Sequence, residues 1–136
     1  MRKLIPLLTA AALLLATGAS AAHREQANPR GEAELAKLLA GRVAGKPVDC
    51  INNLDYSNTR VIDGTAIVYS HTNRTIYVNR PTSGAASLDN DDILVTRQWG
   101  SQLCSIDMVN LVDRTSRFPH GFVSLGQFVP YTKVKS

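Results

Sequence analysis

The three histidines are the side chains best suited to acid–base chemistry, and they lie far apart in the chain. His120 has Asp107 and Asp113 nearby in the sequence, and His71 follows Asp63. A histidine that is oriented by a carboxylate can accept and return a proton during hydrolysis. The chain has neither a G-x-S-x-G elbow nor an S-x-x-K motif to supply a serine nucleophile. A small hydrolase that uses His120 with a nearby aspartate is therefore an alternative function, and a non-enzymatic one is preferred.

Four consecutive residues, Asp89 to Asp92 (DNDD), carry the oxygen ligands that calcium prefers. An EF-hand loop needs glycine at its sixth position and glutamate at its twelfth. Counted from Asp89, these positions hold Leu94 and Gly100, so the EF-hand motif is absent. An acidic turn before a strand that begins at Ile93 explains the segment better, with an irregular calcium site as the alternative. The histidines have no H-x-x-H or H-E-x-x-H spacing, so no metal site and no cofactor are expected.

Two polar loops, residues 79–92 and 114–121, carry the side chains most suited to binding, since loops on a rigid sheet are where binding sites usually lie. If strand pairing gathered Arg80, Arg97 and Arg114, they could hold an anionic ligand. Arginines scattered over solvent-exposed faces would only protect strand edges. The single tryptophan could stack on a sugar or a peptide, or cap the core. The candidates for a contact surface are Arg80, Trp99, Arg114, Arg117 and His120.

The first 21 residues have the organisation of a secretory signal peptide. Two basic residues after the first methionine precede an apolar run at 4–16, and Ala19 to Ala21 form a small-residue cleavage site. The apolar run is shorter than the ~20 residues that span a bilayer, which disfavours an uncleaved anchor helix. The sequence therefore predicts export to the periplasm or the medium. The mature chain is expected to begin at Ala22 or His23 and to have no membrane span.

The charge of the chain argues against a nucleic-acid partner. Its 136 residues carry a formal charge of +4, from 15 basic and 11 acidic residues. Arg2 and Lys3 belong to the expected leader, and without them 13 basic residues face 11 acidic ones, a net charge of +2. A nucleic-acid-binding domain usually has a much larger basic surface. We expect a monomer that binds an envelope protein or a small ligand.

The only two cysteines, Cys50 and Cys104, lie in the predicted mature chain. In an oxidising compartment an isolated pair in a small domain usually forms a disulfide. Closing a loop of this length stabilises a fold by ~4 kcal/mol through chain entropy. The alternatives are a catalytic thiol, which would have to stay reduced, and a zinc site, which would need four closely spaced ligands. Neither condition is met, so a structural disulfide is the preferred interpretation.

The elements that position these residues begin with one helix. Residues 22–30 are polar and contain Pro29, which predicts a flexible arm before a single β-rich domain at 31–136. Residues 31–40 have leucines at i, i+3 and i+4 and two glutamates in the first turn, which favours an amphipathic helix that docks on a sheet. Gly41 is placed to end this helix in the left-handed conformation.

The rest of the chain alternates short β-branched runs with turn residues, which is typical of antiparallel β-structure. Residues 71–74 predict a four-residue hairpin loop. In the run 103–112, alternation places Cys104, Ile106 and Met108 on one face, which we expect to be buried. The strand candidates are 59–62, 65–70, 75–80, 93–98, 103–112 and 122–131. They favour a mainly β (α+β) fold, a small antiparallel barrel or sandwich of five or six strands with one N-terminal helix and one disulfide.

Four strings cover most of the chain between Gly31 and Tyr131: AKLLAGRVAGKPVDCI, VIDGTAIVY, NRPTSGAASLDNDDILV and GSQLCSIDMVNLVD. Together they resemble a family of short exported bacterial proteins that is known as a domain of unknown function. Members of that family are similar to this chain in an export or lipoprotein leader and in two cysteines at matching places. The resemblance supports pairing of Cys50 with Cys104, and it implies no activity and no ligand.

The leader, the cysteine pair and the missing catalytic motifs together predict a non-enzymatic exported domain. We expect it to bind a partner or ligand in the cell envelope through its loops. The hydrolase that uses His120 is one alternative. A protein inhibitor is the other, in which the loop of residues 79–92 occupies the cleft of an enzyme.

Overall fold

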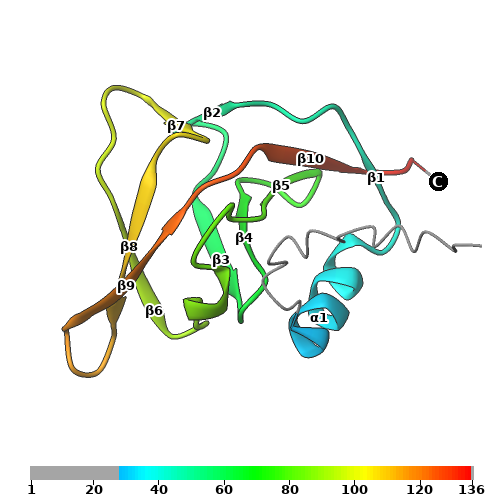
Figure 1. Ribbon diagram of the computed structural model, residues 1–136. Coiled ribbons are helices and arrows are strands. Elements are labelled where there is room, and N and C mark those ends of the chain that lie inside the picture. Colours follow the sequence, from blue (N-terminus) through cyan, green and yellow to red (C-terminus); the bar gives the residue numbers. More distant parts are fainter. Residues whose placement is uncertain (1–27, 136) are drawn as a thin grey trace, which may run out of the picture.

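The computed structural model describes residues 28–135, which form one α-helix, one short 3-10 helix and ten strands in three antiparallel sheets (Figure 1). The predicted mainly β fold with one N-terminal helix and one disulfide is confirmed, in its sandwich form. The predicted signal peptide at 1–21 and the part of the predicted arm at 22–27 lie outside the described residues. Within residues 28–135, no helix is both long and apolar enough to cross a bilayer.

The largest sheet has five antiparallel strands in the order β1-β10-β5-β4-β3. Their bounds are β1 (Arg42–Ala44), β10 (Phe128–Lys133), β5 (Thr75–Asn79), β4 (Ala66–Ser70) and β3 (Asn58–Ile62). β4 and β5 pair directly, with Ser70 opposite Ile76, across the residues 71–74. The predicted hairpin is therefore confirmed.

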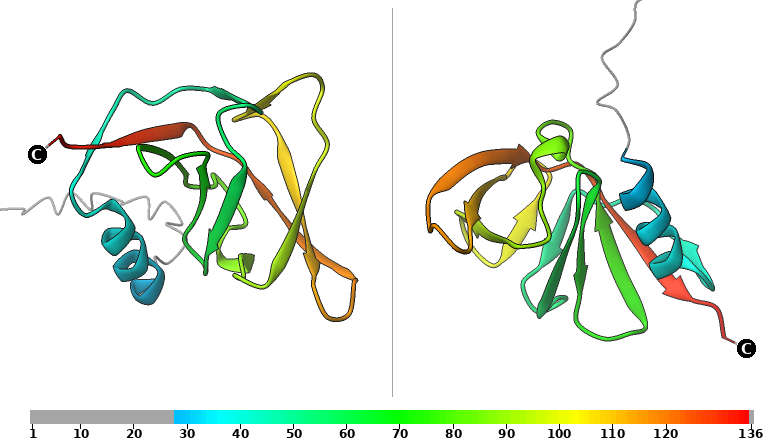
Figure 2. Two further views of the ribbon diagram at one scale, coloured as in Figure 1. Left: turned by 180° about the vertical axis from the view of Figure 1, so that it is seen from behind. Right: turned by 90° about the horizontal axis from the view of Figure 1, so that it is seen from below.

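Helix α1 (Pro29–Leu39) covers one face of this sheet, as the right-hand view of Figure 2 shows. The side chain of Asn28 caps the first turn by accepting a hydrogen bond from the Arg30 backbone N–H at 3.2 Å. Pro29 suits the first helical position, where its missing N–H would have no partner. The helix thus begins two residues before the boundary expected from the sequence. Gly41, with a φ of 71°, follows it in the predicted left-handed conformation.

Leu35 anchors α1, because its side chain is buried between the helix and the sheet. Gly31 approaches the turn after β3 so closely that a Cβ at this position would lie 1.9 Å from the Thr65 hydroxyl oxygen. Only glycine allows this contact. The apolar side chains beneath the helix are Ile62, Ala66, Val68, Ile76 and Val78.

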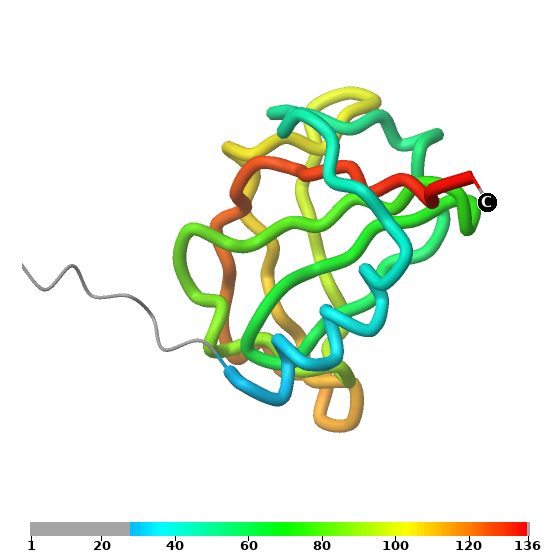
Figure 3. The backbone as a smooth tube through the Cα atoms, turned by 90° about the vertical axis from the view of Figure 1, so that its right-hand side faces the viewer, coloured from blue at the N-terminus to red at the C-terminus, as the bar shows by residue number. Residues whose placement is uncertain are grey.

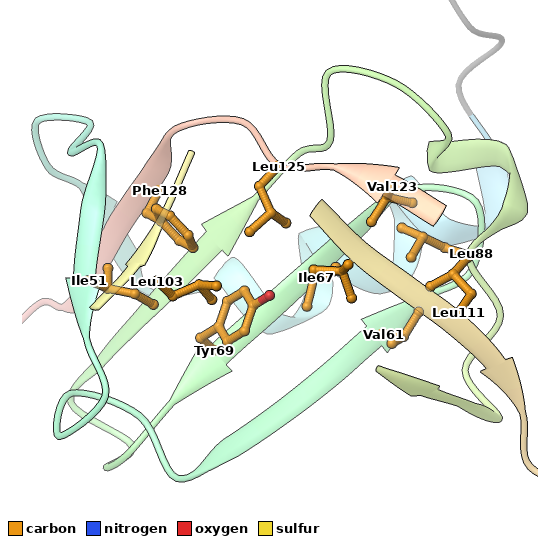
Figure 4. Close-up of a cluster of buried hydrophobic side chains, with 11 residues drawn as sticks. Ile51, Val61, Ile67, Tyr69, Leu88, Leu103, Leu111, Val123, Leu125 and Phe128 are labelled. Carbon is orange, nitrogen blue, oxygen red and sulfur yellow. The ribbon is translucent and has the colours of Figure 1, made fainter. Parts of the chain in front are cut away.

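A three-stranded sheet packs over the opposite face of the five-stranded sheet (Figure 2). It consists of β6 (Asp92–Thr96), β8 (Met108–Asp113) and β9 (Pro119–Ser124), in the order β6-β8-β9. The main core fills the space between the two sheets (Figure 4). Its most deeply buried side chains are Phe128, Ile67, Leu103, Leu111, Val109, Val123 and Leu125.

The third sheet is a two-stranded ribbon of β2 (Cys50–Asn52) and β7 (Gln102–Cys104). Cys50 lies opposite Cys104 in its register, and their sulfurs form a disulfide with the Cα atoms 4.0 Å apart. The predicted disulfide is confirmed. Ile51 and Leu103 of the same ribbon are buried in the main core, so the covalent link fastens one end of the sandwich.

The predicted strand at 103–112 is two strands, β7 and β8, because a turn follows Cys104. The Asp107 carboxylate accepts a hydrogen bond from the Cys104 N–H at 2.8 Å, and the Asp107 N–H donates to the Cys104 carbonyl at 3.0 Å. This turn interrupts the alternation of faces. Ile106 is 88% exposed and Met108 is 49% exposed, so the prediction that they share a buried face with Cys104 is wrong.

The predicted strand at 122–131 is also divided, into β9 and β10. At the break, the Gly126 N–H donates to the side-chain oxygen of Asn79 at 3.0 Å, and the Gly126 carbonyl accepts from the Asn79 amide at 2.6 Å. This exchange satisfies the buried Asn79 side chain. Such breaks, and the three-residue strands β1, β2 and β7, yield ten short strands where the sequence suggested five or six.

Candidate binding site

The connection between β8 and β9, residues 114–118, protrudes at the bottom of Figure 3 (orange). It carries two of the five predicted contact residues, Arg114 and Arg117, and a third, His120, follows it at the start of β9. Its turn is held locally, since the Asp113 carbonyl accepts a hydrogen bond from the Arg117 N–H at 2.9 Å. Hydrogen bonds from Ser116, of which the backbone N–H bond measures 2.5 Å, lower the pKa of Asp113. The Asp113 carboxylate is therefore ionised at neutral pH.

His120 lies beside the start of β6, where its Nε2 is 2.7 Å from Oδ1 of Asp92. The Asp92 side chain is 3% exposed and that of His120 is 38% exposed. The hydrogen bond to Asp92 raises the pKa of His120, and the charges of Asp92, Asp113 and Asp89 act in the same direction. The imidazole therefore stays protonated to a higher pH than a free histidine.

The structure corrects the expected partner of His120. Asp107 is engaged in the turn after Cys104, and Asp113 is near His120 without being its hydrogen-bond partner. The antiparallel register places Asp92 of β6 opposite Asp113 at the end of β8, next to the start of β9. From the sequence, Asp92 is predicted only to belong to an acidic turn, because no residue near it in the chain indicates which strand lies beside β6.

A hollow of about 430 Å³ opens beside this pair, and we call it the hairpin hollow. It is lined by four aspartates, Asp89, Asp91, Asp92 and Asp113, together with Ser116, Phe118 and His120. Phe118 is 73% exposed on the hairpin connection. An exposed aromatic ring beside convergent polar groups is a feature of binding sites rather than of solvated turns.

The hairpin hollow is negatively charged. Its four carboxylates face one imidazolium, that of His120, and one guanidinium, since Arg114 Nε is 3.1 Å from Asp91 Oδ1. A concave surface lined by one sign of charge attracts ions of the opposite sign. The arrangement therefore favours a cationic ligand group over an anionic one.

The DNDD segment forms the acidic turn predicted before β6. Asp89 Oδ1 accepts a hydrogen bond from the Asp91 N–H at 2.9 Å, and Asp92 Oδ2 accepts from the Asp89 N–H at 3.2 Å. Asn90 donates from its backbone and its side chain to the carboxylate of Asp63, at 2.6 and 3.1 Å. Among residues 28–135, no three His, Cys, Asp or Glu side chains are grouped to hold a metal ion.

The rest of the loop at 79–92 packs against the main core and the end of β9. It contains the 3-10 helix η1 (Ala85–Ser87), and Leu88, directly after it, is buried in the main core. Ser83 pairs with Ser124 in an isolated bridge to the end of β9. These contacts favour a structural role for the loop over that of an inserted inhibitory segment.

The predicted arginines are held by separate partners. Arg80 makes two hydrogen bonds to the Glu32 carboxylate, at 2.6 and 2.9 Å, which tie the end of β5 to α1 and lower the pKa of Glu32. Arg114 bonds Asp91 at the hairpin hollow. The guanidinium of Arg117 has no hydrogen-bond partner among the described residues. Strand pairing has not collected Arg80 and Arg114 into one anion site.

Trp99 and His71 lie away from the hairpin hollow. Trp99 is 96% exposed in the connection after β6, whereas the hollow lies where β6 begins, so the two are at opposite ends of this strand. His71 Nδ1 is 3.2 Å from Ser57 Oγ, and Asp63 is bonded to Asn90. The alternative acid–base pair of His71 with Asp63 does not form. Of the residues that line the hairpin hollow, His120 is a predicted contact residue, whereas Asp92 and Phe118 are not.

No family model matches the chain, and no curated protein and no solved structure matches it significantly. The resemblance to an exported family of unknown function stays a prediction.

Proposed function

We propose that this protein is an exported, disulfide-stabilised binding domain of the cell envelope, which binds its partner at the hairpin hollow. The signal-peptide pattern of residues 1–21 supports export. The Cys50–Cys104 disulfide is compatible with an oxidising compartment such as the periplasm or the medium. The observation that carries the binding role is the hairpin hollow, in which charged groups and an exposed aromatic ring meet at the loop end of a sheet.

The partner group that suits this hollow is a cation, such as the lysine or arginine side chain of an envelope protein. The Asp113 carboxylate is ionised and accessible, and the hydrogen-bonded pair of Asp92 and His120 lines the hollow beside it. The exposed ring of Phe118 can contact a cation through its face. A protein surface or a small amine could present such a group, and both would be recognised by the same charges.

Binding is tested by NMR titration of the isotope-labelled mature protein with Nα-acetyl-arginine methylamide, and with Nα-acetyl-glutamate methylamide as the matched anion. We expect saturable chemical-shift changes around the hairpin hollow with the arginine derivative only. Phe118→Ala should weaken this binding severalfold. Trp99→Ala removes another exposed aromatic ring at the opposite end of β6, so it should leave the affinity unchanged. An equal response to the anion would exclude the proposed function.

Export is tested by cell fractionation and intact-mass measurement of the native protein. The expected species begins at Ala22 or His23 and has the mass of the oxidised Cys50–Cys104 pair. An intact leader with both thiols free would contradict export.

The hydrolase is a second candidate, because Asp92 orients His120 at 2.7 Å as a general base requires. Ser116 lines the same hollow, although its hydroxyl accepts from the Phe118 N–H at 3.4 Å and no described hydroxyl bonds His120. A turnover screen on envelope polymers and simple esters, with His120→Ala in parallel, separates the two functions. Turnover that is lost in the variant would favour the hydrolase.

A further inference from the structure

A second hollow opens where the two sheets part. β3 is the last strand of the five-stranded sheet and β6 is the first of the three-stranded sheet, so each has a free edge within residues 28–135. Between these edges lies a hollow of about 270 Å³, slightly smaller than the range of about 300–1,000 Å³ for small-molecule sites. We call it the Tyr69 hollow. Its polar lining comes from Tyr56, Thr59, Tyr69, Thr96 and Gln98, and two leucines complete it.

Tyr69 is a buried residue whose hydroxyl has no protein hydrogen-bond partner in the part of the chain that the structure describes. The residue is 3% exposed, and no residue among 28–135 exchanges a hydrogen bond with its hydroxyl. Among these residues no buried side-chain nitrogen or oxygen lacks a partner, so the unpartnered Tyr69 oxygen is accessible to solvent, and Tyr69 is one of the residues that line the hollow. Figure 4 shows its oxygen pointing into the space between the sheets. The hydroxyl of a buried tyrosine usually has a hydrogen-bond partner, so this accessible and unpartnered hydroxyl is available to a ligand.

The Tyr69 ring is fixed in place by two other rings. Its centroid is 5.1 Å from that of Tyr56 and 5.7 Å from that of Phe128, both in edge-to-face geometry. Burial raises the pKa of Tyr69, so the hydroxyl keeps its proton and can donate. A donor whose position is fixed before binding loses little conformational entropy when a ligand arrives.

The rest of the lining is neutral and able both to donate and to accept. Thr59 and Thr96 add two hydroxyls from the facing strands, and hydroxyls can serve in either role. None of the side chains that line this hollow carries a charge, so an ionised ligand would be desolvated without compensation. We propose that the Tyr69 hollow is a binding site for a small, neutral, hydroxyl-rich ligand of the size of one sugar ring.

A hydrogen-bonded chain borders this site. The Gln98 side-chain amide donates to the Tyr56 hydroxyl oxygen at 3.0 Å, and the Tyr56 hydroxyl donates to Asn53 Oδ1 at 3.1 Å. The chain links the segment after β6 to the segment before β3, so it bridges the two sheets at the hollow. The Gln98 amide oxygen has no partner among the described residues, which leaves it able to accept from a ligand hydroxyl.

The site is independent of the hairpin hollow, because the two have no lining residue in common. Failure of cation binding at the hairpin hollow therefore leaves this proposal standing, and the reverse also holds.

The experiment is an NMR titration of the mature protein with glucose and N-acetylglucosamine, with glucosamine and glucuronate as charged counterparts. We expect saturable shifts in the backbone signals of Tyr56, Thr96 and Gln98 with the neutral sugars, and weaker binding of the charged ones. Tyr69→Phe removes only the hydroxyl and should weaken binding about tenfold, as loss of one hydrogen bond does.

The matched control is Tyr77→Phe, which removes a phenol hydroxyl directly opposite Tyr69 on β5 but outside the lining of the hollow. It should leave the affinity unchanged. If Tyr69→Phe disturbs folding, Thr96→Val tests the same hydroxyl-lined site with a side chain of the same shape. Absence of saturable shifts, preference for a charged sugar, or equal affinity of the wild type and the folded hydroxyl-deletion variant would overturn the proposal and leave a hollow that holds water only.

Discussion

The hairpin hollow and the Tyr69 hollow share one strand. Alternate residues of β6 point to the inside of the sandwich, and Asp92 lines the first hollow while Leu94 and Thr96 line the second. The hairpin hollow is charged and stands at the end of the sheet, next to a protruding turn. The Tyr69 hollow is neutral and lies between the two sheets.

The difference between them comes from the neighbouring elements rather than from β6. At the hairpin hollow, the end of β8 adds Asp113 and the start of β9 adds His120 to the aspartate of β6. At the Tyr69 hollow, β4 and β7 add Tyr69 and Leu103, both from the main core. One strand thus contributes to a charged hollow and to a neutral hollow within a few residues. The elements that pack against each part of the strand supply the other lining side chains and so determine the charge of each hollow.

Removing the disulfide should have the largest effect on this pair of sites. The double substitution C50S/C104S is expected to lower the free energy of unfolding by ~4 kcal/mol, measured by urea denaturation. Leu103, next to Cys104 on β7, is part of the Tyr69 hollow, so NMR signals there should shift while those of the hairpin hollow stay. Equal changes at both hollows would show that they behave as one unit.

Phe128→Leu should affect the Tyr69 hollow and leave the hairpin hollow unchanged, with a smaller loss of stability than removal of the disulfide. The Phe128 ring is fully buried and supports Tyr69 at 5.7 Å, and its replacement by an aliphatic side chain should cost about 1–2 kcal/mol. We expect more motion of the Tyr69 ring in relaxation measurements and no change at His120. A change in the titration of His120 in this variant would contradict the independence of the two sites.

Asp92→Asn should change only the charged site, and its effect should depend on pH. The pKa of His120 is raised above its ordinary value of 6.5, so its pairing stabilises the fold below that value and is lost as the pH rises through the raised pKa. The melting temperature of the wild type should therefore fall toward that of the variant over this window. NMR titration of the His120 ring should show a lower pKa in the variant.

An unchanged pKa of His120 in Asp92→Asn would show that the hydrogen bond at 2.7 Å does not control its protonation. His120→Gln is the matched control, since it removes the titrating group and should abolish the difference in pH dependence.

Trp99→Ala should have the smallest effect. The side chain is 96% exposed, beyond the end of β6 and outside the lining of both hollows. Exposed substitutions of this kind usually stay within about 0.5 kcal/mol. We expect an unchanged unfolding midpoint and unchanged binding at both sites. A loss of sugar binding in this variant would extend the Tyr69 hollow toward the connection after β6.

The elements that follow from local rules were predicted well. The leucine spacing of α1, the left-handed Gly41 after it and the loop between β4 and β5 all depend on residues within a few positions of one another. The pairing of Cys50 with Cys104 needed no spatial information, because the chain offers only one possible partner for each.

The breaks in the long strands were not predictable in the same way. Ile106 and Met108 fit the alternating pattern of a buried strand, yet Asp107 forms a turn with Cys104 that exposes both. The early start of α1 was missed because Pro29 suggested an irregular arm, whereas proline is favourable at the first position of a helix capped by Asn28.

By itself, the sequence determined the β-rich class, the helix and the covalent link, and it singled out His120 as a candidate. Only the tertiary structure decided that Asp92 is the partner of His120. It also decided that Tyr69, with its unpartnered hydroxyl, lines a hollow between the free edges of β3 and β6. The physical reason is the range of the forces involved. Caps, turns and periodicity act between near neighbours in the chain, whereas strand register and sheet edges result from the packing of the whole core, to which every buried side chain contributes.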